Sequence, residues 1–236
     1  MMFPARALYS FLLLILIAAS GCQHAPRPVA VMQEQAPLPD TAPSPFEAEI
    51  LAFETADRLQ PPPHGGIVFV GSSSFRLWPN LPQAFPGHVV VNRGFGGSTL
   101  PEVIRFAPRI VLPLTPTTVV IYAGDNDIKS GRMPSQVLAD YRNLVRLLRR
   151  SLPDVRIVLV SIKPSPSRWA LVDRMREANA LLAQEVARDP RASFVDVFTP
   201  MLGADGLPRP ELYVADALHM SPAGYALWRE RIGPAL

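Results

Sequence analysis

Two segments far apart in the sequence carry side chains that could act together as a nucleophile and its base. Asp216 and His219 stand three residues apart, a spacing that lets one turn present both side chains together. A carboxylate that accepts the Nδ1 hydrogen of an imidazole fixes its tautomer, so that Nε2 can take a proton from a hydroxyl. A serine of the run Gly71-Ser72-Ser73-Ser74, which follows an apolar segment, is the candidate nucleophile, although such a run is also an ordinary turn.

Two further polar segments could stabilise the negative charge that such an attack creates on a carbonyl oxygen. Gly94, Gly96 and Gly97 follow the second apolar segment, and glycines allow a ligand to approach the backbone closely. Asn126 follows the third apolar segment, where its amide could donate to an oxyanion or simply cap the next turn. The glycine spacing differs from the G-x-G-x-x-G pattern of Rossmann loops, which disfavours dinucleotide binding.

These segments need a scaffold that brings the ends of strands together. After Pro61-Pro62-Pro63 the sequence alternates between short Val- and Ile-rich runs and longer helical stretches. The runs, typical of strands buried on both faces of a parallel sheet, are 67–70, 89–91, 118–122, 156–161 and 194–197. The expected helices are 46–59, 100–110, 135–150, 168–188 and 221–232. This alternation predicts an α/β fold, a three-layer α/β/α flavodoxin-like sandwich with a central, mostly parallel five-stranded sheet, which binds ligands outside the carboxyl ends of its strands.

The four polar blocks resemble those of the SGNH hydrolases, also called GDSL-like esterases and lipases, and they occur in that family's order at successive strand ends. The resemblance spans nearly the whole globular part of the chain. It implies that Ser73 is the nucleophile, with Asp216 and His219 as its activating pair. It also implies an oxyanion hole made by the Ser73 backbone, Gly97 and the Asn126 side chain.

The first block departs from the family's usual Gly-Asp-Ser-Leu, because Ser72 replaces the aspartate and Ser74 the leucine. Either flanking serine could therefore be confused with the nucleophile, although the family register favours the middle one. The glycine of the family's second block can likewise be aligned with Gly94, Gly96 or Gly97, and counting from Asn92 favours Gly97.

The resemblance implies a carboxylic ester hydrolase that works through an acyl-enzyme and needs no metal or organic cofactor. Short acyl esters, such as acetyl esters of carbohydrates or small lipids, are favoured because nothing long and apolar is inserted to form an acyl-chain tunnel. A lysophospholipase or thioesterase acting on longer acyl chains stays an alternative. Two others are a metal-dependent phosphoesterase built on Asp125, Asp127, Asp216 and His219, and a non-catalytic carbohydrate-binding lipoprotein.

The segment after the fourth expected strand should border the site, because ligands bind at the carboxyl ends of the strands. It contains Lys163, Arg168 and Trp169, which are candidate contacts for the substrate. A rigid loop that packs Trp169 into the domain is an equally good interpretation.

The first residues have the pattern of an export signal, in which a charged start precedes a short apolar run and small residues. The small residues before Cys22 resemble a bacterial lipobox, which implies a lipoprotein signal peptide over 1–21 and a lipid on Cys22 that anchors the protein to the cell envelope. Gln23 after the cysteine implies the periplasmic face of an outer membrane. Residues 22–45 are rich in proline and predict a semi-extended tether, followed by a hydrolase domain over 46–236.

The composition gives no sign of a nucleic-acid partner. The 236-residue chain has a formal net charge of +3, and its basic residues are spread along the sequence rather than clustered in a run. A single cysteine excludes an internal disulfide. The expected partners are therefore a small-molecule or glycan ester and, through Cys22, a membrane.

Overall fold

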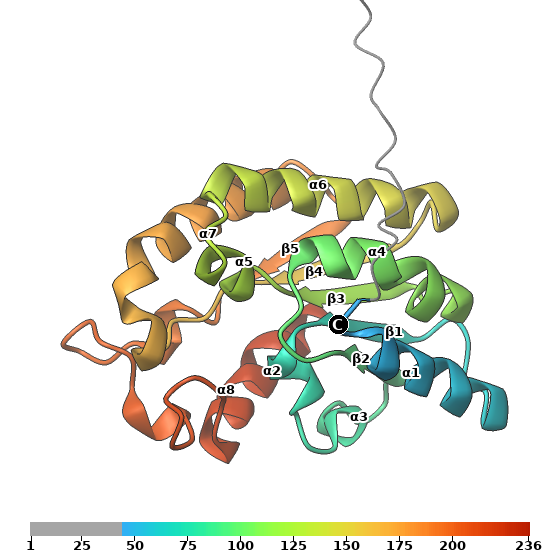
Figure 1. Cartoon of the computed structure of the whole chain (residues 1–236), viewed down its shortest axis with the longest axis horizontal. Coiled ribbons are helices and arrows are strands. Elements are labelled where there is room, and N and C mark those ends of the chain that lie inside the picture. The colour runs from blue at the N-terminus through green and yellow to red at the C-terminus, as the bar shows by residue number, and fades with distance from the viewer. Residues whose placement is uncertain (1–43) are drawn as a thin grey trace, which may run out of the picture. The chain divides into compact units, whose positions relative to one another are not determined.

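Five parallel strands form the central sheet, in the order β2-β1-β3-β4-β5 (Figure 1). The computed structural model describes residues 44–236. The strands are β1 (Ile67–Gly71), β2 (Val90–Gly94), β3 (Thr118–Tyr122), β4 (Arg156–Val160) and β5 (Ala192–Val195). Because every neighbouring pair is parallel, the carboxyl ends of all five strands meet at one edge of the sheet. The α/β fold with a five-stranded parallel sheet, expected from the sequence, is confirmed.

Helices cover both faces of the sheet and give the three expected layers (Figure 1). The α-helices are α1 (Glu47–Leu59), α2 (Ser73–Arg76), α3 (Leu81–Ala84), α4 (Leu100–Ile110), α5 (Asp125–Lys129), α6 (Pro134–Ser151), α7 (Val172–Val186) and α8 (Pro222–Ile232). Short 3-10 turns are η1 (Leu112–Leu114), η2 (Pro166–Leu171), η3 (Thr199–Met201), η4 (Pro210–Leu212) and η5 (Gly233–Ala235).

The alternation of side chains along β1 divides the core into two halves. Val68 and Val70 belong to the half that is covered by α4, α6 and α7. Ile67 and Phe69 belong to the half that is covered by α2, α3 and α8. All four side chains are buried. A parallel strand covered on both faces has no solvent-facing side, and for this reason its sequence is a continuous apolar run.

The chain leaves β1 at a glycine that the sheet requires. Gly71 has a φ of +142°, and a Cβ at this position would lie 1.8 Å from the carbonyl oxygen of Tyr122 on β3. That carbonyl accepts the Ser72 N–H at 3.0 Å, while the Gly71 carbonyl accepts the Phe95 N–H at 2.9 Å. The turn that carries Ser73 is therefore fixed by backbone bonds to the segments that follow both neighbouring strands.

β2 extends beyond the range 89–91 expected from the sequence, because Asn92 and Arg93 stay in register with β1. Their polar side chains interrupt the apolar run, but both find partners. The Asn92 amide donates to the Phe75 carbonyl at 2.8 Å, and the Arg93 guanidinium pairs with Asp57 of α1. Polar residues can therefore continue a strand where neighbouring elements satisfy them.

The expected helix 168–188 is shorter and begins after a kink. Arg168 lies in η2 with φ −119° and ψ +18°, outside the helical region, so η2 and α7 are separate elements. β5 ends at Val195, two residues before the end expected for the range 194–197. The other expected helices and strands agree with the structure to within one residue at each end.

Most of the N-terminal predictions lie outside the described residues. This applies to the signal peptide over 1–21, to the lipid on Cys22 and to the tether up to residue 43. The described part begins at Ser44, whose carbonyl accepts the Glu47 N–H at 3.0 Å at the start of α1. Among residues 44–236, no helix is both long and apolar enough to cross a bilayer.

Replacing Asp57 with alanine should destabilise the protein. The Arg93 side chain is 7% exposed, and loss of its partner leaves a buried cation without a counter-charge. We expect the free energy of unfolding to fall by about 2 kcal/mol, seen as a lower urea midpoint at an unchanged slope. Asp154→Ala is the control, because it breaks only a solvent-exposed pair with Arg191 and should change stability by less than about 0.5 kcal/mol. Equal losses in the two variants would contradict this explanation.

Candidate active site

Ser73, His219 and Asp216 form a hydrogen-bonded chain at the carboxyl edge of the sheet. His219 Nε2 lies 3.0 Å from Ser73 Oγ, and His219 Nδ1 lies 2.5 Å from Asp216 Oδ2. Ser73 is the first residue of α2, directly beyond β1, whereas the other two lie in the loop between η4 and α8. In this order the imidazole can accept a hydroxyl proton on one nitrogen while the carboxylate holds the other.

Exposure separates the three consecutive serines that follow β1. Ser72 and Ser74 are each 1% exposed, while Ser73 is partly exposed and contacts His219. The Ser72 N–H is used by the sheet, since it donates to the Tyr122 carbonyl. The geometry therefore favours Ser73 over its two neighbours as the nucleophile.

Backbone hydrogen bonds fix the Asp216 carboxylate within its own turn. The N–H groups of Leu218 and His219 both donate to Asp216 Oδ1 at 2.9 Å, which leaves Oδ2 for the imidazole. Ala217 has a φ of +54°, a left-handed conformation that costs a non-glycine residue roughly 1 kcal/mol. Desolvation opposes ionisation of Asp216, but the hydrogen bonds from the His219 ring and from the two N–H groups lower its pKa to about 2. The carboxylate is therefore charged at neutral pH.

The three glycines at the end of β2 and just beyond it have different surroundings. A Cβ on Gly94 would lie 2.4 Å from the backbone nitrogen of Arg76, so this glycine lets the end of β2 pack against α2. The Gly96 N–H donates to the Glu49 carboxylate of α1 at 3.3 Å. Gly97 is exposed with a φ of +77°, and a Cβ there would meet nothing within 4 Å. Gly97 is therefore the glycine whose backbone is most open to a ligand.

Asn126 lies in α5 and is held at both ends of its side-chain amide. Its Nδ2 donates to the Ser98 carbonyl at 3.0 Å, and its Oδ1 accepts from Arg168 Nη2 at 2.9 Å. The amide nitrogen carries two hydrogens, so the bond to Ser98 leaves one for a ligand. Because Ser98 follows Gly97, this bond brings the glycine loop and the asparagine together.

Two of the three side chains expected to contact the substrate belong to a charged network around Asp125. Lys163 is 1% exposed, and its Nζ lies 3.3 Å from Asp125 Oδ2, so its burial is incompatible with the direct substrate contact expected from the sequence. Arg168 Nη1 lies 3.0 Å from the same oxygen. Trp169 is partly buried, and the Arg176 guanidinium lies 5.6 Å from the centre of its ring.

Lys163 and Arg168 keep the buried carboxylate of Asp125 charged. Burial alone would raise the pKa of Asp125, but the two cations outweigh that effect and lower it. Burial in turn lowers the pKa of Lys163, and the Asp125 charge opposes this shift. Sequence reasoning considered Asp125 as a turn cap or metal ligand and missed the network. The available signal was an isolated lysine, in an arginine-rich chain, just after a buried strand.

The side chains considered for a metal site have separate partners. Asp125 pairs with cations, Asp216 with His219, and Asp127 Oδ1 accepts the Leu100 N–H at 3.0 Å. In the part of the chain from residue 44 onward, no three His, Cys, Asp or Glu side chains are grouped as metal ligands. These four side chains therefore do not converge on one point.

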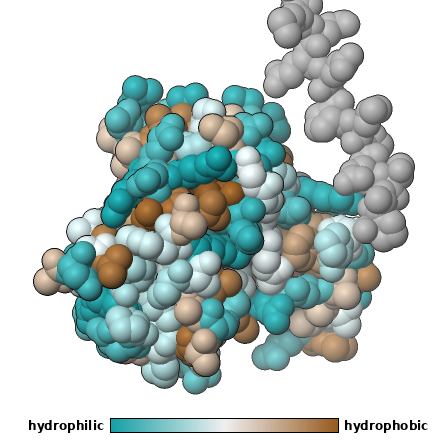
Figure 2. All heavy atoms as spheres, turned by 60° about the vertical axis from the view of Figure 1, so that its left-hand side comes forward, coloured by the Kyte–Doolittle hydropathy of each residue, from teal (hydrophilic) through white to brown (hydrophobic). Residues whose placement is uncertain are grey.

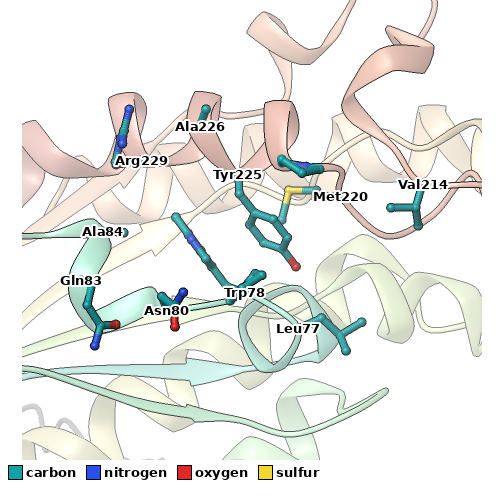
Figure 3. Close-up of a pocket in the computed structure, with 12 residues that line it drawn as sticks. Leu77, Trp78, Asn80, Gln83, Ala84, Val214, Met220, Tyr225, Ala226 and Arg229 are labelled. Atoms are coloured by element: carbon teal, nitrogen blue, oxygen red, sulfur yellow. The ribbon is translucent and has the colours of Figure 1, made fainter.

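A cavity of about 550 Å³ is lined by the segment after α2, by α3 and by α8 with the loop before it (Figure 3). Leu77, at one end of it, donates its N–H to the Ser73 carbonyl at 2.8 Å. Met220 follows His219 directly, and the Val214 N–H donates to the His219 carbonyl at 2.9 Å. The cavity therefore opens next to the proposed nucleophile and its base, a feature that the sequence did not predict.

The walls of the cavity are mostly apolar. The rings of Trp78 and Tyr225 face each other with centroids 5.0 Å apart, and Leu77 and Val214 are exposed hydrophobic side chains at one end. Arg229 lies at the opposite end (Figure 3). On the side that Figure 2 turns forward, hydrophobic residues form separate patches among hydrophilic ones. Apolar binding surface on that side is therefore local rather than extended.

At the carboxyl edge of the parallel sheet, a serine, a histidine and an aspartate are thus joined by hydrogen bonds in this order. The chain belongs to the GDSL-like Lipase/Acylhydrolase family, whose model matches residues 65–227. It is accordingly an esterase or acylhydrolase. The family and the reaction class expected from the sequence are confirmed.

Relatives from distant organisms share this assignment. The chain is 28% identical over 168 residues to platelet-activating factor acetylhydrolase IB subunit alpha1 of Bos taurus, an alignment that covers 67% of this chain and 69% of that protein. It is 27% identical over 139 residues to the isoamyl acetate-hydrolyzing esterase of Schizosaccharomyces pombe, covering 57% and 56%. A solved GDSL-like lipase of Bacteroides thetaiotaomicron has a TM-score of 0.67 at 23% identity, over 80% of this chain and 97% of that one. This last likeness shows the shared fold.

Asp127 should make the protein less stable as the pH rises from about 4 to about 6. Burial raises the pKa of its carboxyl from 3.8 to about 6, against the opposing bond from the Leu100 N–H. In this window the folded state keeps a proton that the unfolded state has released, so the free energy of unfolding falls with rising pH. Asp127→Asn keeps an acceptor for Leu100 without a charge. It should exceed the wild type in stability above pH 7 by on the order of 1 to 3 kcal/mol.

Urea unfolding of both proteins at several pH values measures this difference. The gap in unfolding free energy should close as the pH falls well below 3.8, where the aspartate is protonated in both states. Two parallel stability profiles would mean that Asp127 does not titrate differently in the folded protein.

Proposed function

We propose that the protein hydrolyses carboxylic esters with Ser73 as nucleophile, His219 as general base and acid, and Asp216 as the carboxylate that orients His219. The observation that carries this proposal is the 3.0 Å contact between Ser73 Oγ and His219 Nε2. The Asp216 contact on Nδ1 supports it, because it leaves Nε2 free to accept a proton. Both separations are within the hydrogen-bond reach that proton transfer needs.

The reaction proceeds in two halves. Ser73 Oγ attacks the ester carbonyl carbon as its proton passes to His219 Nε2, and collapse of the tetrahedral intermediate expels the alcohol, which takes that proton. The acyl group is then bonded to Ser73. Water loses a proton to His219 and attacks the acyl carbon, which releases the acid and returns the proton to Ser73 Oγ. The charged Asp216 stabilises the imidazolium in both halves.

The proposed oxyanion hole consists of the Ser73 N–H, the Gly97 N–H and Asn126 Nδ2. Ser73 begins α2, and N–H groups in the first turn of a helix lack an intrahelical acceptor. Gly97 contributes an exposed backbone, and Asn126 contributes the amide hydrogen that Ser98 does not use. Loss of one such donor costs about 3 to 4 kcal/mol of transition-state stabilisation in comparable hydrolases.

Short acyl esters of carbohydrates or small lipids, with acetyl as the preferred acyl group, are the proposed substrates. Two relatives support this by name, since one is an acetylhydrolase and the other hydrolyses isoamyl acetate. The neighbouring cavity could hold the alcohol part of such an ester. The exposed Leu77 and Val214 side chains at one end of the cavity offer apolar surface for an alkyl group, whereas the Trp78 and Tyr225 rings are buried against each other.

We also propose that the protein is exported and held at the periplasmic face of the outer membrane by a lipid on Cys22. The support is the sequence around Cys22, with the apolar run and small residues before it and the proline-rich stretch after it. Radioactive palmitate fed to expressing cells should label the wild-type protein and leave Cys22→Ala unlabelled. Equal labelling of the two proteins would contradict lipidation at this residue.

Ser73→Ala should lower kcat by about 10⁴-fold or more, and Asp216→Asn by roughly 10⁴-fold, because each removes part of the proton-transfer chain. The measurement is hydrolysis of p-nitrophenyl esters from acetyl to palmitoyl by the full-length protein with EDTA present. The acetyl ester should give the highest kcat/KM. Ser151→Ala, at the end of α6, is the matched control and should leave kcat unchanged.

The outcomes separate the competing functions. Full activity in Ser73→Ala would overturn the serine mechanism, and activity lost on adding EDTA would favour the metal-dependent alternative. An optimum at long acyl chains would replace the acetyl preference with a lysophospholipase or thioesterase activity. Failure to cleave any ester would favour the carbohydrate-binding alternative.

A further inference from the structure

The buried network around Asp125 has no direct part in the proposed proton transfer, yet it lies beside the oxyanion asparagine. Asp125 Oδ2 is 3.3 Å from Lys163 Nζ and 3.0 Å from Arg168 Nη1. The Lys163 side chain is 1% exposed and that of Arg168 is 13% exposed. Buried charges are costly to keep, so a network of two cations and one anion next to a catalytic amide calls for a physical explanation.

Arg168 connects this network to Asn126. Its Nη2 donates to Asn126 Oδ1 at 2.9 Å. A guanidinium has donors only, so the amide atom that faces it must be the oxygen, and the amide NH₂ must point the other way. That direction leads to the Ser98 carbonyl beside the glycine loop. Without Arg168 only the Ser98 carbonyl would hold the amide in this direction, and an amide that turned over would present an oxygen, which repels an oxyanion.

The loop 161–171 that carries Arg168 is also bonded to the loop of the acid–base pair. The Ser167 N–H donates to the carbonyl of Ala217, between Asp216 and His219, at 3.1 Å. The Pro164 carbonyl accepts from the Tyr213 hydroxyl at 2.7 Å. One loop therefore holds both the turn of the base and the amide of the oxyanion hole.

We propose that Arg168 is a positioning residue that holds the Asn126 amide with Nδ2 toward the oxyanion, and that Asp125, which also pairs with Lys163, holds Arg168 in turn. This inference rests on the proposed function and deepens it. The assignment of Arg168 to Asn126 rather than to the substrate rests on the bond from Nη2 to Asn126 and on the burial of Nη1 beside Asp125. This positioning role replaces the direct substrate contact that the sequence led us to expect for Arg168.

A double-mutant cycle tests the proposal on the full-length protein. Arg168→Met keeps the length of the side chain without donors, and should lower kcat for p-nitrophenyl acetate about 10- to 100-fold with KM changed by less than about threefold. Asn126→Ala should lower kcat by about 100-fold or more. In the Asn126→Ala background, Arg168→Met should change kcat by less than about threefold, because the amide that it positions is gone.

Two further variants sharpen the cycle. Arg168→Lys keeps the charge, but a single ammonium cannot replace the planar guanidinium at both partners, so its kcat should stay at least about fivefold below the wild type. Arg146→Ala removes an arginine that donates to the exposed Asn143 amide on α6, and as the matched control it should leave kcat unchanged. If Arg168→Met fails to fold, Arg168→Lys replaces it in the cycle.

Each outcome decides one question. Losses that multiply in the double variant would overturn positioning through Asn126, and a raised KM at unchanged kcat would assign Arg168 to substrate contact instead. Recovery of wild-type kcat in Arg168→Lys would overturn positioning by the guanidinium, because charge alone would then suffice. Activity that survives in Ser73→Ala would overturn the proposed function itself, so the two failures are distinguishable.

Discussion

The parallel pairing of β1 with β2 and β3 is the constraint on which the rest of the site depends. It places three strand ends side by side, and each end leads into a segment that carries one part of the site: Ser73, the glycine loop and Asn126. Gly71 preserves the pairing to the last residue of β1, since any side chain there would collide with the Tyr122 carbonyl. The sheet therefore fixes three backbone positions before any functional side chain makes a contact.

The two halves of the site are held by different forces. The Asp216–His219 pair is partly exposed and depends on hydrogen bonds within one short turn. The oxyanion side depends on buried charges, with Asp125 between Lys163 and Arg168. Salt screens exposed charges much more than buried ones. The charge interactions on the proposed oxyanion side should therefore weaken less with rising ionic strength than those of the Asp216–His219 pair. The bond from the loop 161–171 to the turn of the base joins these two halves.

Local patterns in the sequence were enough to predict most of the fold and the three residues of the hydrogen-bonded chain. β3 and α4 match their expected ranges to the residue, because an apolar run and a capped helix start are local signals. What local patterns could not predict depends on distant partners. β2 continues through Arg93 because the Arg93 guanidinium forms an ion pair with Asp57 of α1. Lys163 can be buried because its ammonium pairs with Asp125, which follows another strand. The kink at Arg168 and the cavity likewise arise only from tertiary packing.

The cavity beside the hydrogen-bonded chain draws its walls from the segment that follows α2, from α3 and from α8 with the loop before it, and none of its described lining residues comes from a strand. Its size and polarity can therefore change by substitutions in these surface segments while the sheet and the reacting groups stay in place. If the cavity holds the alcohol as proposed, the residues that recognise the alcohol are separate from those that cleave the ester. One unchanged reaction centre can serve different leaving groups when the segments around it are exchanged.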